Sequence, residues 1–166
     1  TVTGVQTCAL PIYAIHALRT LGQVAGGEPA VVKARAVERE GSPGMDATMD
    51  VDVEYPSGLS AHFTSSFVVP EMDFTLRITG TRGEALAHNF CISSLDDRIS
   101  VDVDGSSRVE ECGRKTSYTY QLEAFADHVR TDAPIFTDAD DAVTQAEFID
   151  ACYLAAGLPL RPLSHV

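Results

Sequence analysis

The fold is decided by one stretch, residues 46–58, which reads DATMDVDVEYPSG. Between residues 46 and 55, apolar side chains take every second position, and acidic or hydroxyl side chains take the positions between. A period of two is typical of a β-strand with one buried and one solvated face. The Pro-Ser-Gly that follows is a turn signal. The stretch therefore predicts one arm of an antiparallel sheet.

Six further segments carry strand signals and are joined by short turns. They span residues 30–40, 59–69, 74–79, 84–89, 99–104 and 108–112. Several of the turns between them hold only a few residues, fewer than the crossover that parallel strands need. We therefore expect a largely antiparallel open sheet of about six or seven strands.

Three segments repeat apolar residues at helical spacing. They span residues 13–22, closed by Gly22, then residues 117–130, and finally a helix that starts with a capping-box pattern at residues 137–140 and ends before Gly157. The predicted apolar stripes of the first and third helices are Ala14, Ala17, Leu18 and Leu21, and Ala142, Ala146, Ile149, Tyr153 and Ala156. The order of elements indicates an α+β fold with the helices on one face of the sheet. The other face carries hydrophobic residues between 63 and 69, so we expect a second copy of the chain to cover it.

Composition narrows the possible partners. The 166 residues fit one domain, and 24 acidic against 12 basic residues give a net charge of -12. This acidity argues against nucleic acid and against an anionic membrane surface, because both need a basic footprint. No apolar run approaches the ~20 residues of a membrane span. The four cysteines and five histidines are scattered, which predicts no metal site and the reduced thiols of a cytoplasmic protein.

Tyr13 and His16 are the candidate site residues. They are three positions apart and so share one face of the first predicted helix, beside its apolar stripe. A phenol and an imidazole are groups that can carry a proton in a reaction. Taken on spacing alone, a structural role for both residues is the commoner interpretation.

The first twelve residues show no polar face and no helix cap. Read back into codons, residues 2–12 resemble the translation of a common short-read sequencing adapter. We therefore expect residues 1–12 to be non-native and the natural sequence to begin at Tyr13. Resequencing the source locus across this junction tests the expectation, and an intact frame that encodes these residues would contradict it.

Several motifs together carry a family resemblance. They are Y-x-x-H-x-L-R-x-L-G at 13–22, Y-P-S-G at 55–58, L-x-I-x-G-T-x-G at 76–83 and I-D-A-x-Y-x-A at 149–155. In this order they resemble the C-terminal domain of the Gfo/Idh/MocA oxidoreductases, over residues 13 to about 163. Tyr13 makes the chain similar to the branch of glucose-fructose oxidoreductase and the dihydrodiol or pentose dehydrogenases.

The resemblance implies an activity that is shared between two domains. Relatives bind NAD or NADP in an N-terminal Rossmann domain and use the C-terminal domain for substrate and oligomerisation. No strand-linked G-x-G-x-x-G occurs here, so we expect that domain to be missing and this chain alone to bind no cofactor. Tyr13 matches the catalytic His or Tyr, and His16 matches a substrate-contacting position. The Asp that precedes the catalytic residue by one turn corresponds to Ala9.

Two functions follow as expectations. The first is a truncated NAD(P)-dependent dehydrogenase of a sugar, polyol or diol, assembled as a homodimer or tetramer through the open sheet face and inactive as this fragment. The second is a free-standing, non-catalytic module that dimerises or binds a small polar ligand. Upstream genomic sequence separates the two, because only the first requires a Rossmann domain in frame.

Overall fold

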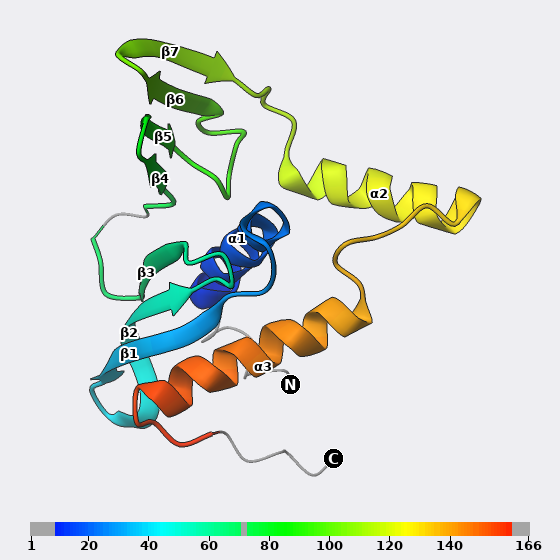
Figure 1. The fold of residues 1–166 in the computed structure, drawn as a ribbon. Helices are drawn as coiled ribbons and strands as arrows, with labels where there is room; N and C mark the ends of the chain where they lie inside the picture. The colour runs from blue at the N-terminus through cyan, green and yellow to red at the C-terminus, as the bar shows by residue number, and fades with distance from the viewer. Residues whose placement is uncertain (1–8, 71–72, 161–166) are drawn as a thin grey trace. The chain divides into compact units, whose positions relative to one another are not determined.

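The computed structural model describes residues 9–70 and 73–160. It divides into two compact units, one made of residues 1–70 and 137–166 and the other of residues 71–136. Three helices and seven strands lie in the described part, and every strand pairing there is antiparallel (Figure 1). The α+β class and the seven strands are therefore confirmed. The strands form two sheets, of three and four strands.

The first unit is a three-stranded sheet with two helices. Its strands are β1 (Ala30–Arg39), β2 (Ser42–Glu54) and β3 (Ser60–Ser66), in the order β1-β2-β3. Helix α3 (Ala139–Ala155) packs on β1, α1 (Ala9–Ala25) packs on β3, and the two helices contact each other. The fold thus brings the first and last helices together, although more than a hundred residues separate them in the chain.

The alternation of residues 46–55 is confirmed by the register. Val51 pairs with Phe63 and Val53 with Ala61 across β2 and β3. Met49, Val51 and Val53 are at most 1% exposed, and burial of each such side chain contributes about 1.5–3 kcal/mol. The helices complete the core with Ile15, Leu18, Ala25, Phe148, Cys152 and Tyr153.

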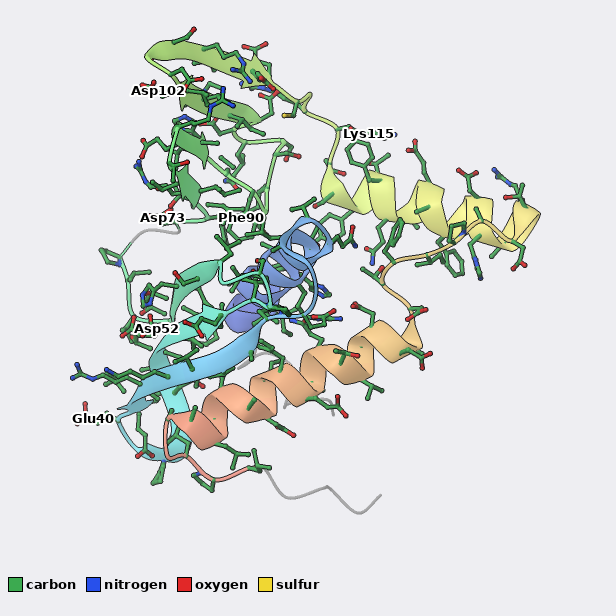
Figure 2. All side chains as sticks on the ribbon, in the orientation of Figure 1. Glu40, Asp52, Asp73, Phe90, Asp102 and Lys115 are labelled. Carbon is green, nitrogen blue, oxygen red and sulfur yellow. The ribbon has the colours of Figure 1, made fainter. Side chains whose placement is uncertain are left out.

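The opposite face of this sheet is polar. Asp52, labelled in Figure 2, is the direct cross-strand partner of His62. The side chains of Asp52 and His62 are 53% and 55% exposed. The expectation of hydrophobic residues on the open face is wrong for Phe63, which is 7% exposed and belongs to the core. Strand β3 ends at Ser66, and just beyond it the Ser66 hydroxyl accepts the Val68 N–H at 3.2 Å. Residues 67–69 then lie outside the strand and are exposed.

Helix α1 runs further than the sequence predicted. Gly22 lies within it, and the left-handed Gly26, with φ of 88°, follows its end. A Cβ on Gly22 would stand 2.5 Å from the carbonyl oxygen of Gly27. Gly22 is therefore needed for the close approach of the returning chain and not as a helix stop. The buried face carries Ile15 beside Leu18, and the other members of the predicted stripe are partly buried.

Helix α3 begins one residue later than the predicted capping box. Its N-cap is Asp138, whose carboxylate accepts a hydrogen bond from the Asp141 N–H at 2.9 Å. The buried residues of α3 are Gln145, Phe148, Cys152 and Tyr153. Ala142 and Ala146 of the predicted stripe are exposed. Tyr153 is buried and Ile149 packs on the core as predicted, and the prediction is wrong at Ala142 and Ala146, because the polar Gln145 takes a position of the buried stripe.

The second unit holds the other sheet and helix α2 (Ser117–Thr131). Its strands are β4 (Leu76–Gly80), β5 (Gly83–Ala87), β6 (Arg98–Val103) and β7 (Ser106–Glu111), paired in sequence order. This confirms the predicted meander of short hairpins. The register gives the sheet one face of mainly apolar side chains and one of mainly polar side chains.

Helix α2 confirms the predicted segment but not its predicted place on a sheet. The hydroxyl of its N-cap, Thr116, accepts the N–H of Thr119, and Asp132 closes the helix in the left-handed conformation. No residue of α2 is buried. At its start, the Lys115 ammonium lies 4.5 Å from the centre of the Tyr120 ring. Among the described residues, α1 and α3 each pack on a strand of the three-stranded sheet.

Candidate functional site

Both sequence-predicted site residues lie on α1, one turn apart. Tyr13 is 42% exposed, and the side chain of His16 is 38% exposed. The neighbouring face of the helix, through Ile15 and Leu18, is buried in the core. A phenol and an imidazole therefore sit half-buried on a helix whose orientation the core fixes. The roles assigned to them from the sequence stay predictions.

One turn beyond His16, Arg19 ties α1 to two other segments. The side chain of Arg19 is 9% exposed. Its Nε and Nη2 donate to the two carboxylate oxygens of Glu28, at 2.8 and 3.2 Å. Its Nη1 lies 2.6 Å from Oδ1 of Asp141 on α3. The hydrogen bond to Glu28 is the main cause that raises the pKa of Arg19, so the guanidinium stays charged although it is largely buried.

Asp141 and Gln145, on successive turns of α3, complete a polar cluster around α1. The second carboxylate oxygen of Asp141, Oδ2, lies 3.9 Å from Nδ1 of His16. Gln145 Oε1 accepts from Nη1 of Arg19 at 3.3 Å, and its Nε2 donates to the backbone oxygen of Ile12 at 3.1 Å. The two side chains thus contact α1 on both sides of Tyr13 and His16. We call Arg19, Glu28, Asp141 and Gln145 the α1–α3 clamp.

Tyr55 supports the same helix from the sheet. It is 3% exposed, and its hydroxyl donates to the backbone oxygen of Leu18 at 2.8 Å. Burial raises the pKa of this phenol, and the nearby charge of Glu28 adds to the effect. Tyr55 is therefore a neutral hydrogen-bond donor at ordinary pH. Helix α1 is therefore held by Tyr55 on the side that faces the core and by the α1–α3 clamp on the side that faces α3.

Sequence reasoning found the two exposed members of this site and missed the clamp. Arg19 enters the sequence analysis only as part of a family-like motif, and Asp141 and Gln145 are not singled out there. The contacts join positions 122 and 126 residues apart. A single sequence carries no periodic signal for such a pair. The one available clue is Gln145, a polar residue on the stripe that Phe148 and Cys152 continue.

The described residues give little support for other kinds of site. No group of three or more His, Cys, Asp or Glu side chains is arranged to hold a metal among them. No described helix is long and apolar enough to cross a bilayer. Dinucleotide sites form where a parallel strand leads through a glycine-rich turn into a helix. The described strands pair only in antiparallel fashion, so the described residues form no such turn.

Comparison with known proteins gives one family. The GFO/IDH/MocA C-terminal domain family matches residues 5–86. D-xylose 1-dehydrogenase (NADP(+)) 2 of Haloferax volcanii is 31% identical over 114 residues, which cover 68% of this chain and 35% of that protein. The chain therefore spans about a third of this curated relative.

Solved structures show the same fold. A levoglucosan dehydrogenase in complex with NADH and levoglucosan matches with a TM-score of 0.68 and 16% identity, over 89% of this chain and 49% of the other. A UDP-N-acetylglucosamine 3-dehydrogenase from Acidithiobacillus ferrooxidans matches with a TM-score of 0.64 and 18% identity, over 86% of this chain and 44% of the other. At these identities the likeness concerns the fold.

Proposed function

Because the chain contains a Gfo/Idh/MocA C-terminal domain, we propose that it is the substrate-side domain of an NAD(P)-dependent oxidoreductase acting on a hydroxyl of a sugar, polyol or diol. The observation that carries the proposal is the placement of Tyr13 and His16, one turn apart and half-exposed on a helix that the α1–α3 clamp holds. In the proposed site of the parent enzyme, Tyr13 in its phenolate form accepts the proton of the substrate hydroxyl and becomes a phenol, and His16 hydrogen-bonds a second hydroxyl.

The charge of the site favours a neutral substrate over an anionic one. Arg19 faces two carboxylates, those of Glu28 and Asp141, so the clamp carries a net charge of about -1 close to His16. The whole chain is acidic as well, at -12. An acidic site repels anions and leaves neutral hydroxyls unaffected. We therefore propose uncharged sugars, polyols or diols in preference to sugar acids or sugar phosphates.

The nicotinamide cofactor enters this proposal only through the parent enzyme. The described residues contain no parallel strand that leads into a dinucleotide-binding turn, and the curated relative is about three times as long as the matched part of this chain. We therefore propose that the 166-residue chain shows no dehydrogenase turnover with NAD or NADP. Steady turnover of either cofactor with D-xylose by the purified chain would overturn this proposal.

Substrate binding tests the site independently of turnover. The ¹H–¹³C NMR signals of the Tyr13 and His16 rings are recorded while D-xylose, D-xylitol or D-xylonate is added to the chain. We expect the neutral sugar or polyol to shift both rings and the anionic D-xylonate to shift them less. Tyr13→Phe should weaken the shifts at His16, whereas the control Tyr118→Phe, at a site 72% exposed on α2, should not. Absence of any shift with all three compounds would contradict the proposed site.

The polar face of the three-stranded sheet supports a proposal on oligomerisation. Lys33 pairs with Asp52 and Arg35 with Asp50 across β1 and β2, so a column of cations runs beside a column of acids. A twofold copy laid face to face can set each cation over an acid of its partner. We propose a homodimer or tetramer through this face. Sedimentation at increasing salt tests the proposal, and a species insensitive to both salt and Lys33→Glu would contradict it.

A further inference from the structure

We propose that Asp141 is a positioning residue that holds the His16 imidazole in its Nδ1–H tautomer, which leaves Nε2 as the hydrogen-bond acceptor of the ring. The consequence for a substrate hydroxyl rests on the proposed function, whereas the tautomer itself does not. Nothing in the sequence motifs assigned a role to Asp141. Its assignment comes from the arrangement of three side chains on two helices.

The first step is that the two carboxylate oxygens of Asp141 have different partners. Oδ1 of Asp141 lies 2.6 Å from Nη1 of Arg19, within charge-assisted hydrogen-bond distance. Nη1 of Arg19 also contacts the backbone oxygen of Asp141 at 3.3 Å. Oδ2 lies 3.9 Å from Nδ1 of His16. The arginine therefore fixes the carboxylate with one oxygen, and the other oxygen lies near the δ nitrogen of the ring.

The second step is the effect of that oxygen on the ring. A neutral imidazole carries its proton on one nitrogen, and the partner of each nitrogen decides which. A carboxylate accepts hydrogen bonds and donates none, so its charge favours a proton on Nδ1 over a lone pair there. The distance of 3.9 Å is beyond a direct hydrogen bond. The preference therefore acts through the field of the charge, or through one bridging water.

The third step is the rigidity of the groups that impose this preference. Glu28 holds the far side of Arg19 with two hydrogen bonds. The N–H of Asp141 is bound to the N-cap Asp138, which fixes the backbone at this turn of α3. The Gln145 side chain donates a hydrogen bond to the backbone oxygen of Ile12 in α1. The charged groups that surround His16 are thus held from α1, from α3 and from the segment between α1 and β1.

The fourth step is what the ring offers outward. His16 is 38% exposed, so a small molecule can reach the ring. With the proton on Nδ1, the other nitrogen presents a lone pair and accepts from a donor such as a hydroxyl. In the opposite tautomer the same nitrogen would be a donor. The position of one proton therefore sets whether His16 recognises a hydroxyl hydrogen or a hydroxyl oxygen.

The experiment reads the tautomer directly in the 166-residue chain. Histidine is labelled with ¹⁵N, and long-range ¹H–¹⁵N correlation spectra are recorded at mildly alkaline pH, where free imidazole is neutral. The His16 signals are identified as those that His16→Asn removes. We expect a protonated Nδ1 and an unprotonated Nε2 in the unmodified chain. A protonated Nε2 there would overturn the proposal without any further variant.

Two variants separate positioning from simple stabilisation. Asp141→Asn removes the charge and places an amide near the ring, so we expect the majority tautomer to change to Nε2–H. The matched control is Glu28→Gln, which weakens the other side of the clamp but leaves the Asp141 carboxylate beside His16. We expect the Nδ1–H form to persist in Glu28→Gln. An unchanged tautomer in Asp141→Asn, or the same change in both variants, would overturn the proposal.

The outcomes also separate this inference from the proposed function. An Nδ1–H ring with no response to D-xylose or D-xylitol would leave the role of Asp141 intact and count against the proposed substrate site. A ring that responds to D-xylose but carries its proton on Nε2 would support the proposed substrate site and count against the role of Asp141. The tautomer and the ligand response are measured on the same labelled sample.

Discussion

Replacing Tyr55 by phenylalanine removes one hydroxyl from the support of the site helix. The hydroxyl donates to the backbone oxygen of Leu18 at 2.8 Å in a place that is 3% exposed to solvent. Its loss leaves the ring in the core, so no large cavity forms. The carbonyl oxygen of Leu18 can still accept the backbone hydrogen bond of the α-helix, so the substitution does not leave it without a donor. We therefore expect the free energy of unfolding to fall by about 1 kcal/mol, the net contribution of one hydrogen bond.

The same variant has a second signature at alkaline pH. Burial raises the pKa of Tyr55 above its usual 10.0. From pH 10 up to that raised value, the unfolded chain has lost the phenol proton and the folded chain retains it. The stability of the unmodified chain therefore falls as pH rises, by at most about 1.4 kcal/mol per pH unit from this group. Tyr55→Phe lacks the group, so its disadvantage should shrink above pH 10.

Urea unfolding followed by circular dichroism measures both effects, and hydrogen exchange in α1 and β2 locates them. Tyr118→Phe is the control, because that hydroxyl is on a residue 72% exposed on α2 and its removal should change stability by less than about 0.5 kcal/mol. Equal losses in the two variants would refute the role of the Tyr55 hydroxyl. A gap between wild type and Tyr55→Phe that stays constant from pH 8 to pH 11 would refute the argument from its pKa.

Two further predictions concern packing and thiol chemistry. Gly22→Ala should destabilise the first unit by about 1–3 kcal/mol, although alanine is the better helix former, because the new Cβ meets the Gly27 carbonyl oxygen at 2.5 Å. The control Gly80→Ala, whose new Cβ has its nearest contact at 3.9 Å, should be tolerated. Equal unfolding midpoints for the two variants would contradict this prediction. Of the three cysteines in the described residues, native thiol labelling mapped by peptide mass spectrometry should modify the exposed Cys112 first and spare Cys152, because burial raises the pKa of Cys152 to about 12. Rapid modification of Cys152 in the folded chain would contradict the packing of α3.

The strands were predictable because their signal is local. The alternation that ends at Tyr55 places one side of β2 in the core wherever the strand pairs, and short turns leave no room for a crossover. The predicted and observed strands agree closely for β1, β6 and β7. Where β3 ends, the prediction ran too far, because the apolar residues 67–69 continue the pattern after the ladder has stopped. Apolar composition alone does not distinguish a buried strand from an exposed apolar loop.

The helices were harder because their buried faces are partly polar. An apolar period places Ala142 and Ala146 inside, but α3 turns Gln145 inward to reach α1. Likewise Gly22 resembles a helix stop until the carbonyl of Gly27 is seen beside it. In both cases the deciding partner comes from another element. Helix propensity and apolar periodicity are properties of a single element. Contacts with other elements can therefore override the buried face that they predict.

These failures fall at the same place as the candidate site, and one cause explains both. Tyr13 and His16 were found because they share one helical face, which is local information. The groups that orient them must come from across the fold, since a helix cannot hold its own exposed side chains from outside. Arg19 shows the result, a buried cation that joins Glu28 to a carboxylate on α3. A buried arginine is stabilising only when such partners are present, so its burial depends on α3 being in place. The sequence thus identifies two candidate side chains that share one helical face, and only the fold shows which side chains hold that helix in place.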